Sequence, residues 1–217
     1  MKIDNKTIAA LREDYRAKTL EINDINSNPF LQFKNWFQEA LNSSVKEANA
    51  MTIATVDAEG KPSARIILLK GFDENGFIFY TNYDSKKGQD LAANPHIAAV
   101  FLWKDLERQI RIEGKAKKIT KAASLQYFQS RPKGSQIGAW ASPQSQVIPD
   151  RSILENNVVA LKEKYKDADN LPIPNHWGGY VIVPTLIEFW QGRSSRLHDR
   201  IRYKLKGENW IIERLAP

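Results

Sequence analysis

A chain of 217 residues is expected to form one domain, and at this size it can bury about 70% of its unfolded surface without disulfides. The absence of cysteine excludes disulfides, thiolate nucleophiles and cysteine-ligated zinc, and the three histidines are too scattered to predict a metal cluster. The net charge of +7 has three explanations: ordinary solvation, nucleic-acid binding, or a phosphorylated ligand held by a few converging cations.

The first residues of the chain and the length of its apolar runs indicate where in the cell the protein is expected. The first twenty residues are charged and lack the apolar core of a signal peptide. No apolar run approaches the ~18–20 residues of a membrane span. We therefore expect a soluble, cytoplasmic protein without a membrane partner.

Two amphipathic helices are predicted near the N-terminus. The first covers residues 7–18, where apolar or aromatic side chains recur at helical spacing. The second begins at Asn28, an N-cap residue followed by proline in the first turn. Its apolar stripe is expected in the core and contains Phe30, Phe33, Phe37 and Leu41.

From Ala50 onward the apolar residues recur with the period of two that is typical of strands. Such a series of short strands, accompanied by peripheral helices, predicts a mainly β, barrel-type domain. The predicted strands cover residues 51–56, 64–69, 77–81, 97–103, 108–119, 180–191, 196–205 and 210–214.

Three further helices and one long loop are predicted between the strands. Asp84 is expected to cap the first helix, which stops before an Asn-Pro pair. Thr120 is expected to begin the second, which ends at Arg131 because a residue before proline disfavours helical dihedral angles. A loop rich in serine, glutamine and proline is expected over 133–149, and a charged helix over 151–166.

Residues 187–200, called here the signature segment, contain two aromatic residues, three arginines, one histidine and two carboxylates. If a strand resumes at Arg196, its period of two places Arg196, His198 and Arg200 on one face. Such groups repel one another unless solvent or a bound anion compensates them. The pattern therefore fits both a solvated basic face and a ligand site.

Neither a Gly-x-Gly-x-x-Gly turn nor a Walker-type phosphate loop occurs in the sequence. A bound phosphate would therefore be held mainly by arginine, lysine and hydroxyl side chains. Arg65 and Lys70 are candidates on one predicted strand. Lys86 and Lys87 are candidates at a predicted helix start, near free backbone donors that suit an anion. Taken alone, each pair also fits solvated charge.

Several segments resemble one enzyme family. Glu-Phe-Trp-Gln at 188–191, followed after four residues by Arg-Leu-His-Asp-Arg at 196–200, resembles the C-terminal signature of the pyridoxamine 5′-phosphate oxidases. The resemblance extends from about residue 10 to the end of the chain. Other segments that resemble the family are 65–70, 79–82, 130–132, 135–140 and 214–217.

The resemblance implies a fold: a single-domain FMN-binding split β-barrel, mainly β with peripheral helices, assembled as a homodimer with flavin sites at the subunit interface. Residues 1–25 would form an N-terminal helix and a candidate active-site lid. Residues 26–217 would form the split-barrel FMN-binding domain, including the C-terminal signature strands.

The resemblance also implies an activity. The enzyme would oxidise pyridoxamine 5′-phosphate or pyridoxine 5′-phosphate to pyridoxal 5′-phosphate. A hydride would pass from substrate C4′ to flavin N5, and O2 would reoxidise the flavin with release of H2O2. Neither a metal nor a nucleic-acid partner is implied. Two alternatives stay open: a split-barrel flavoprotein with another substrate, and a non-catalytic basic β-barrel that binds nucleic acid.

The family pattern assigns roles position by position. Arg196 and His198 are implied as catalytic residues at the pyridine ring, where a general-base role for His198 stays open because the flavin itself takes the hydride. Position 86 is commonly arginine in the family, and lysine keeps the charge but lacks the bidentate fork. The residues implied for FMN are Arg65, Ile66, Ile67, Leu68, Tyr80, Thr81, Lys86, Lys87, Gln109, Gln144, Ser145, Trp190 and Arg200. Those implied for the substrate are Lys70, Tyr127, Arg131 and Ser135 at its phosphate, and Arg12 and Tyr15 in the lid.

Overall fold

The structure is a computed structural model that describes residues 4–11 and 13–217. It divides into two compact units. Unit 1 contains the described residues up to Ala48 together with Val100–Ile112 and Thr185–Pro217, and unit 2 contains Asn49–Ala99 and Glu113–Pro184. The two units share three strands of the sheet, because the boundaries between them fall within these strands.

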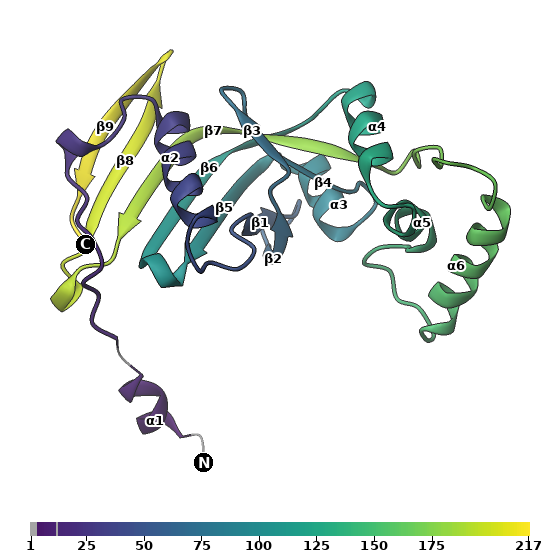
Figure 1. Cartoon of the computed structure of the whole chain (residues 1–217), viewed down its shortest axis with the longest axis horizontal. Coiled ribbons are helices and arrows are strands. Elements are labelled where there is room, and N and C mark those ends of the chain that lie inside the picture. Colours follow the sequence, from purple (N-terminus) through teal and green to yellow (C-terminus); the bar gives the residue numbers. More distant parts are fainter. Residues whose placement is uncertain (1–3, 12) are drawn as a thin grey trace. The chain divides into compact units, whose positions relative to one another are not determined.

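In the described part of the chain, nine strands form one sheet (Figure 1). They are β1 (Ala50–Val56), β2 (Pro62–Leu68), β3 (Gly71–Asp73), β4 (Gly76–Asn82), β5 (His96–Trp103), β6 (Arg108–Lys118), β7 (Trp177–Gln191), β8 (Asp199–Lys206) and β9 (Asn209–Leu215). Their order is β2-β1-β5-β6-β7-β4-β3, with β8 paired to β7 and β9 to β8. The predicted mainly β fold with peripheral helices is confirmed.

The helices begin where capping residues stand. Asn28 Oδ1 accepts hydrogen bonds from the backbone N–H groups of Phe30 and Leu31. Thr120 Oγ1 accepts one from Ala123, so both predicted helix starts are confirmed. The helices are α1 (Asn5–Ala10), α2 (Pro29–Leu41), α3 (Lys86–Ala93), α4 (Lys121–Ser130), α5 (Lys133–Ala141) and α6 (Ser152–Lys164).

In unit 1, the core forms where α2 packs on aromatic strand residues. Phe33 is fully buried, and its ring lies 5.4 Å from that of Phe101. Trp36 lies edge-on to Phe189 of β7 at 5.2 Å between ring centroids. The predicted apolar stripe is wrong at its end, because Leu41 is 57% exposed and Trp36 takes the core position instead.

In unit 2, β1 pairs with β2 and β4 with β7 in antiparallel registers. A second apolar cluster lies among the helices: Phe128 of α4, Ile137 of α5, Leu171 and Trp177 are buried together. Helix α5 packs beside α6 (Figure 1). This helical part of unit 2 supplies one wall of the cavity described below.

Three local predictions are wrong. The helix predicted over 7–18 ends at Ala10, because none of its residues is buried and an unpacked short helix is marginal in water. Ser85 rather than Asp84 caps α3, since its Oγ accepts from the Gly88 N–H. The loop predicted over 133–149 begins instead with helix α5, whose buried residues are Gln136, Ile137 and Ala141.

Candidate active site

Unit 2 contains a cavity of about 700 Å³, called here the unit 2 cavity, whose wall carries four cationic side chains. Arg65 lies on β2 and Lys70 just after it, whereas Lys87 lies on α3 and Arg131 at the end of α4. None of the described residues that line the cavity is acidic. The volume suits a small-molecule ligand, and four cations in a lining without acidic residues favour an anionic one.

The unit 2 cavity brings together most of the residues predicted for cofactor and substrate phosphate. Five of the residues predicted for FMN do not line it: Lys86, Gln109, Ser145, Trp190 and Arg200. The residues predicted for FMN that line the cavity are Arg65, Ile66, Ile67, Leu68, Tyr80, Thr81, Lys87 and Gln144. The residues predicted for the substrate phosphate all line it, namely Lys70, Tyr127, Arg131 and Ser135.

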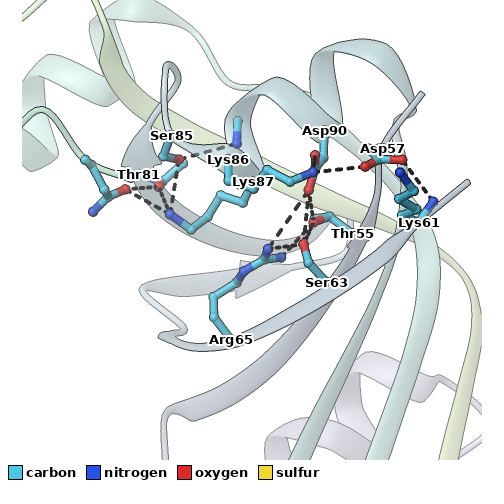
Figure 2. A network of polar contacts seen from close by, with 12 residues as sticks. Thr55, Asp57, Lys61, Ser63, Arg65, Thr81, Ser85, Lys86, Lys87 and Asp90 are labelled. Atoms are coloured by element: carbon cyan, nitrogen blue, oxygen red, sulfur yellow. Dashed lines mark hydrogen bonds and ion pairs between the residues drawn. The ribbon is translucent and has the colours of Figure 1, made fainter. Parts of the chain in front are cut away.

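Lys87 is a buried ammonium whose hydrogen-bond partners among the described residues are all neutral. Its Nζ donates to Thr81 Oγ1 at 3.1 Å, Ser85 Oγ at 3.1 Å and Gln144 Oε1 at 2.8 Å. Figure 2 shows the first two residues of this group around the lysine. Burial, reinforced by the positive charge of Arg65, lowers the pKa of Lys87 to about 8. A bound phosphate would supply the anion that this site lacks.

Arg131 also has unused hydrogen-bonding capacity. Its Nη1 is buried without a hydrogen-bond partner among the described residues. The guanidinium lies 4.9 Å from the ring centroid of Trp177. Burial lowers the pKa of Arg131, although a guanidinium stays charged in proteins. A buried unpaired donor at the wall of a cavity suits an anionic oxygen from a ligand.

Stacked aromatic rings form another part of the wall. Tyr80 of β4 stacks on Tyr127 of α4 at 3.8 Å and on Trp177 at 5.5 Å. Gly179 lies opposite Tyr80 in the β4–β7 register. A Cβ at position 179 would lie 2.8 Å from Tyr80 Cε1, so glycine leaves room for the ring. Sequence reasoning missed Trp177, although an aromatic residue directly before two glycines was a usable signal.

In unit 1, the signature segment is not a continuous strand. β7 ends at Gln191 and β8 begins at Asp199, with a 3₁₀ turn at Ser194–Arg196 between them. Ser195 and Arg196 have φ angles of 56° and 61°, a region that non-glycine residues rarely adopt. The strand predicted from residue 196 is therefore wrong at its start, and the expected one-face row of cations does not form.

His198 is held by aromatic rings and one backbone donor. Its ring lies 4.6 Å from Trp190 and 5.9 Å from Tyr15. The Arg193 backbone N–H donates to His198 Nδ1 at 3.1 Å, so the proton of the neutral ring sits on Nε2. Burial, reinforced by the charge of Arg196, lowers the pKa of His198. Near neutral pH the ring thus presents an N–H donor at Nε2.

The other residues of unit 1 that were predicted for cofactor or substrate differ in their surroundings. Tyr15, Arg196 and His198 share the lining of a second cavity of about 550 Å³. Arg200 donates from Nε to Glu188 Oε1 at 2.8 Å and from Nη1 to the Ala216 carbonyl at 2.9 Å. Gln109 is half-buried on β6. Arg12 lies outside the described residues.

The N-terminal segment is tied to unit 1 by backbone donors. The Ala17 N–H donates to Glu107 Oε2 at 2.8 Å, and the Leu20 N–H donates to Asp199 Oδ2 at 3.1 Å. These bonds place the Tyr15 ring edge-on to Trp190 at 5.8 Å. The segment that was predicted as a lid therefore contacts the signature segment, in an extended rather than a helical form.

Within residues 4–11 and 13–217, no group of three or more histidine, aspartate or glutamate side chains is arranged to hold a metal ion. Among the same residues, no helix is both long enough and apolar enough to cross a membrane.

Two family patterns match the chain. That of pyridoxamine 5′-phosphate oxidase matches residues 37–165, and that of the pyridoxine 5′-phosphate oxidase C-terminal dimerisation region matches residues 177–217. Among solved structures, PhzG from Burkholderia lata, in complex with tetrahydrophenazine-1-carboxylic acid, has a TM-score of 0.88 at 30% identity, covering 94% of this chain and all (100%) of that one. A pyridoxamine 5′-phosphate oxidase-related, FMN-binding protein from Nostoc punctiforme shares the fold, with a TM-score of 0.68 at 18% identity, covering 85% of this chain and 97% of that one.

Curated relatives agree over almost the full length. A pyridoxine/pyridoxamine 5′-phosphate oxidase of Acaryochloris marina is 57% identical over 97% of this chain and 96% of its own. One of Gloeothece citriformis is 56% identical over 98% of this chain and 100% of its own. The chain therefore belongs to the pyridoxine/pyridoxamine 5′-phosphate oxidase family, the FMN-dependent oxidases of the split-barrel fold.

Proposed function

We propose that the unit 2 cavity binds the phosphate of FMN with Arg65 and Lys87, assisted by Thr81 and Gln144. The carrying observation is that Lys87 is buried among neutral partners in a cavity without acidic lining residues. Ile66, Ile67, Leu68 and Tyr80 line the same cavity and would contact the rest of the cofactor. Ser145, Gln109, Trp190 and Arg200 do not line it, and their contact with FMN stays a prediction. Lys86 would instead pair with the carboxylates of Asp57 and Asp90.

The substrate phosphate is proposed to bind at Lys70, Tyr127, Arg131 and Ser135, which line the same cavity. Arg131 contributes the buried, unpaired Nη1 donor, and Tyr127 remains neutral because burial raises the pKa of its hydroxyl. Two cations and two hydroxyls suit a phosphate monoester better than an uncharged alcohol. Phosphorylated vitamers should therefore be strongly preferred.

Arg196 and His198 are proposed to act on the pyridine ring of the substrate. His198 can donate a hydrogen bond from Nε2 to a ring substituent, whereas its Nδ1 is already occupied by the Arg193 N–H. This favours positioning over proton abstraction. Tyr15, with Arg12, would cover the bound substrate as part of the lid, and the lid boundary at residue 25 stays a prediction.

The reaction is the oxidation of pyridoxamine 5′-phosphate or pyridoxine 5′-phosphate to pyridoxal 5′-phosphate. When bound, FMN supplies the hydride-accepting ring. The protein's own residues would hold the substrate phosphate and position the pyridine for oxidation at C4′. We propose O2 as the final acceptor, with release of H2O2, and of ammonia from the amine.

We also propose that the protein is a cytoplasmic homodimer that binds neither nucleic acid nor membranes. The match to a dimerisation region supports the dimer. Large apolar side chains exposed on strands support it too: Ile66 is 72% exposed and Leu102 66%. Sedimentation or light scattering at several protein concentrations would test this, and a monomer throughout would contradict it.

The visible spectrum tests the proposed function. The purified protein should be yellow and should release FMN, not FAD, on denaturation. Anaerobic addition of pyridoxamine 5′-phosphate should bleach the flavin absorbance, and admitting air should restore it. A flavin that another reductant bleaches but this substrate does not would indicate a different substrate. A colourless protein whose oligonucleotide affinity falls steeply with salt would indicate nucleic-acid binding.

A further inference from the structure

Beside the proposed phosphate site, Arg65 is bonded to two hydroxyls that lead to a buried carboxylate (Figure 2). Arg65 Nη1 donates to Thr55 Oγ1 at 2.7 Å, and Nη2 donates to Ser63 Oγ. Both hydroxyls also contact one oxygen of Asp90, Oδ2, at 2.7 Å from Thr55 and 3.2 Å from Ser63. Asp90 is only 2% exposed and lies on α3.

The donor and acceptor roles in this network follow from proton counting. A guanidinium can only donate, and an ionised carboxylate can only accept. Each hydroxyl has a single proton, so Thr55 and Ser63 accept from Arg65 on their lone pairs and donate their protons to Asp90. If either hydroxyl pointed its proton at Arg65 instead, that proton would meet the N–H groups of the guanidinium, which cannot accept it. The negative charge of Asp90 thus determines the orientation of both groups that hold Arg65.

Lys86 binds this carboxylate rather than the cavity. Its Nζ donates to Asp90 Oδ1 at 2.7 Å, from a position four residues earlier on α3, and to Asp57 Oδ2 at 3.2 Å. Burial alone would raise the pKa of Asp90, but the hydrogen bonds from Lys86 and Thr55 hold it below its ordinary value. Asp90 is therefore ionised at neutral pH, as the proton count requires.

We propose that Asp90 is a positioning residue for the cofactor phosphate: acting through Thr55 and Ser63, it orients Arg65, while Lys86 neutralises Asp90 instead of binding the flavin. This inference rests on the proposed FMN site. An arginine side chain has many rotamers, and two fixed acceptors remove much of that freedom before the ligand arrives. Two N–H groups are used in this way, and the others remain available to the phosphate.

Asp90→Asn tests the proposal, with FMN and riboflavin as paired ligands of the apoprotein. Asparagine keeps the shape but removes the charge and adds a donor that competes with the hydroxyl protons. We expect the Kd for FMN to rise about tenfold, the lower end of the loss of one charge-assisted contact, and the Kd for riboflavin to stay within about twofold. Unchanged or tighter FMN binding would overturn the proposal.

A double-mutant cycle separates positioning from general stability. In an Arg65→Met background, Asp90→Asn should have little further effect on the FMN Kd, because its influence passes through Arg65. Additive losses would overturn the proposal. Asp57→Asn is the matched control, since Asp57 also pairs with Lys86 but does not contact the hydroxyls. It should leave the Kd within about twofold.

The variants distinguish a failure of the proposed phosphate site from a failure of the positioning role of Asp90. If Arg65→Met and Lys87→Met both fail to weaken FMN relative to riboflavin, the proposed phosphate site is wrong. If they weaken it but Asp90→Asn does not, only the positioning role is wrong. Should Asp90→Asn fail to fold, Thr55→Val removes one hydroxyl from a fully buried position with little change of shape. It should weaken FMN several-fold without weakening riboflavin, and equal weakening of both would contradict the proposal.

Discussion

The two units hold their cations differently, although Arg65 of unit 2 also has a carboxylate, Asp90, 4.0 Å from its Nη2. In unit 1, the arginines around the signature segment are paired with carboxylates: Arg193 and Arg214 with Asp199, and Arg200 with Glu188. In unit 2, the four cations of the cavity share a lining in which no described residue is acidic. Sequence shows both groups as basic residues near aromatic ones. Only the structure shows which charges are already compensated.

This difference indicates where an anion binds. A cation paired with a carboxylate within the protein gains little from a ligand phosphate, since the phosphate must compete with the carboxylate. A buried ammonium among neutral partners, such as that of Lys87, gains much more. We therefore expect phosphate recognition to depend on unit 2, and ring recognition to depend on the neutral His198 and the exposed Arg196 of unit 1.

Arg131→Ala should have the largest effect, because it removes a buried cation that has an unpaired donor. The KM for pyridoxamine 5′-phosphate should rise about 10- to 150-fold, from the loss of a charge-assisted contact of roughly 1.5–3 kcal/mol. Steady-state kinetics would measure it. Arg151→Ala, at the exposed N-cap position of α6, is the control and should leave the KM unchanged. Equal turnover of unphosphorylated pyridoxamine by the native enzyme would contradict the phosphate clamp.

The adjacent lysines give the sharpest contrast in FMN affinity. Lys87→Met should raise the Kd for FMN by about 10- to 100-fold, since a buried charge-assisted contact is lost. Lys86→Met should raise it by less than about fivefold, because Lys86 is half-exposed and pairs with Asp57 and Asp90. Fluorescence titration of the apoproteins would measure both values. Comparable losses would mean that Lys86 contacts the flavin after all.

Variants of Arg196 and His198 test the role of unit 1. Arg196→Met should retain FMN and lower kcat/KM at least about tenfold, as expected for a lost charged donor to the substrate. His198→Asn should do the same, whereas His198→Gln, whose amide reaches the Nε2 position, should lose less than about threefold. A glutamine variant as impaired as the asparagine variant would favour proton transfer by His198. Loss of flavin from Arg196→Met, with normal kinetics in excess FMN, would contradict the assignment.

The sequence predicted the strand pattern and most of the cavity lining, because these depend on local periodicity and on recognisable segments. It could not predict the end of helix α1 at Ala10, since an amphipathic pattern does not reveal whether a partner surface exists. The turn-type residues at 192–195 predicted a turn between the two strands, but not its extension through Arg196 to Asp199, because its positive φ angles occur at serine and arginine instead of glycine.

The partners of charged residues were the least predictable part of the site. Lys86 and Lys87 are adjacent in sequence, yet one binds carboxylates near the surface and the other is buried at the cavity. Their separation follows from the helix, which directs successive side chains about 100° apart. Asp90 could have been identified, because it lies four residues after Lys86 and such pairs face each other.

A pH dependence of FMN affinity should also be controlled by Lys87. In the folded apoprotein the pKa of Lys87 is lowered to about 8, mainly by burial. A phosphate dianion favours the charged ammonium, so binding raises this pKa. Below about pH 8 the lysine is already protonated, and affinity should be flat with respect to this group. Above it, binding must take up a proton, and the Kd should rise by up to about tenfold per pH unit until the pKa of the complex is reached.

The lowered pKa of Lys87 also predicts how the stability of the apoprotein changes with pH, which can be measured separately. The unfolded lysine keeps an ordinary pKa of 10.5, so between about 8 and 10.5 the unfolded apoprotein binds more protons than the folded one. The contribution of Lys87 to apoprotein stability should therefore increase as pH rises through this window. Lys87→Met should abolish both this increase and the alkaline loss of FMN affinity, while riboflavin affinity should be independent of pH in either protein. A native FMN affinity that stays constant from about pH 7 to about pH 9.5 would show that Lys87 does not face the phosphate, because linkage requires the slope.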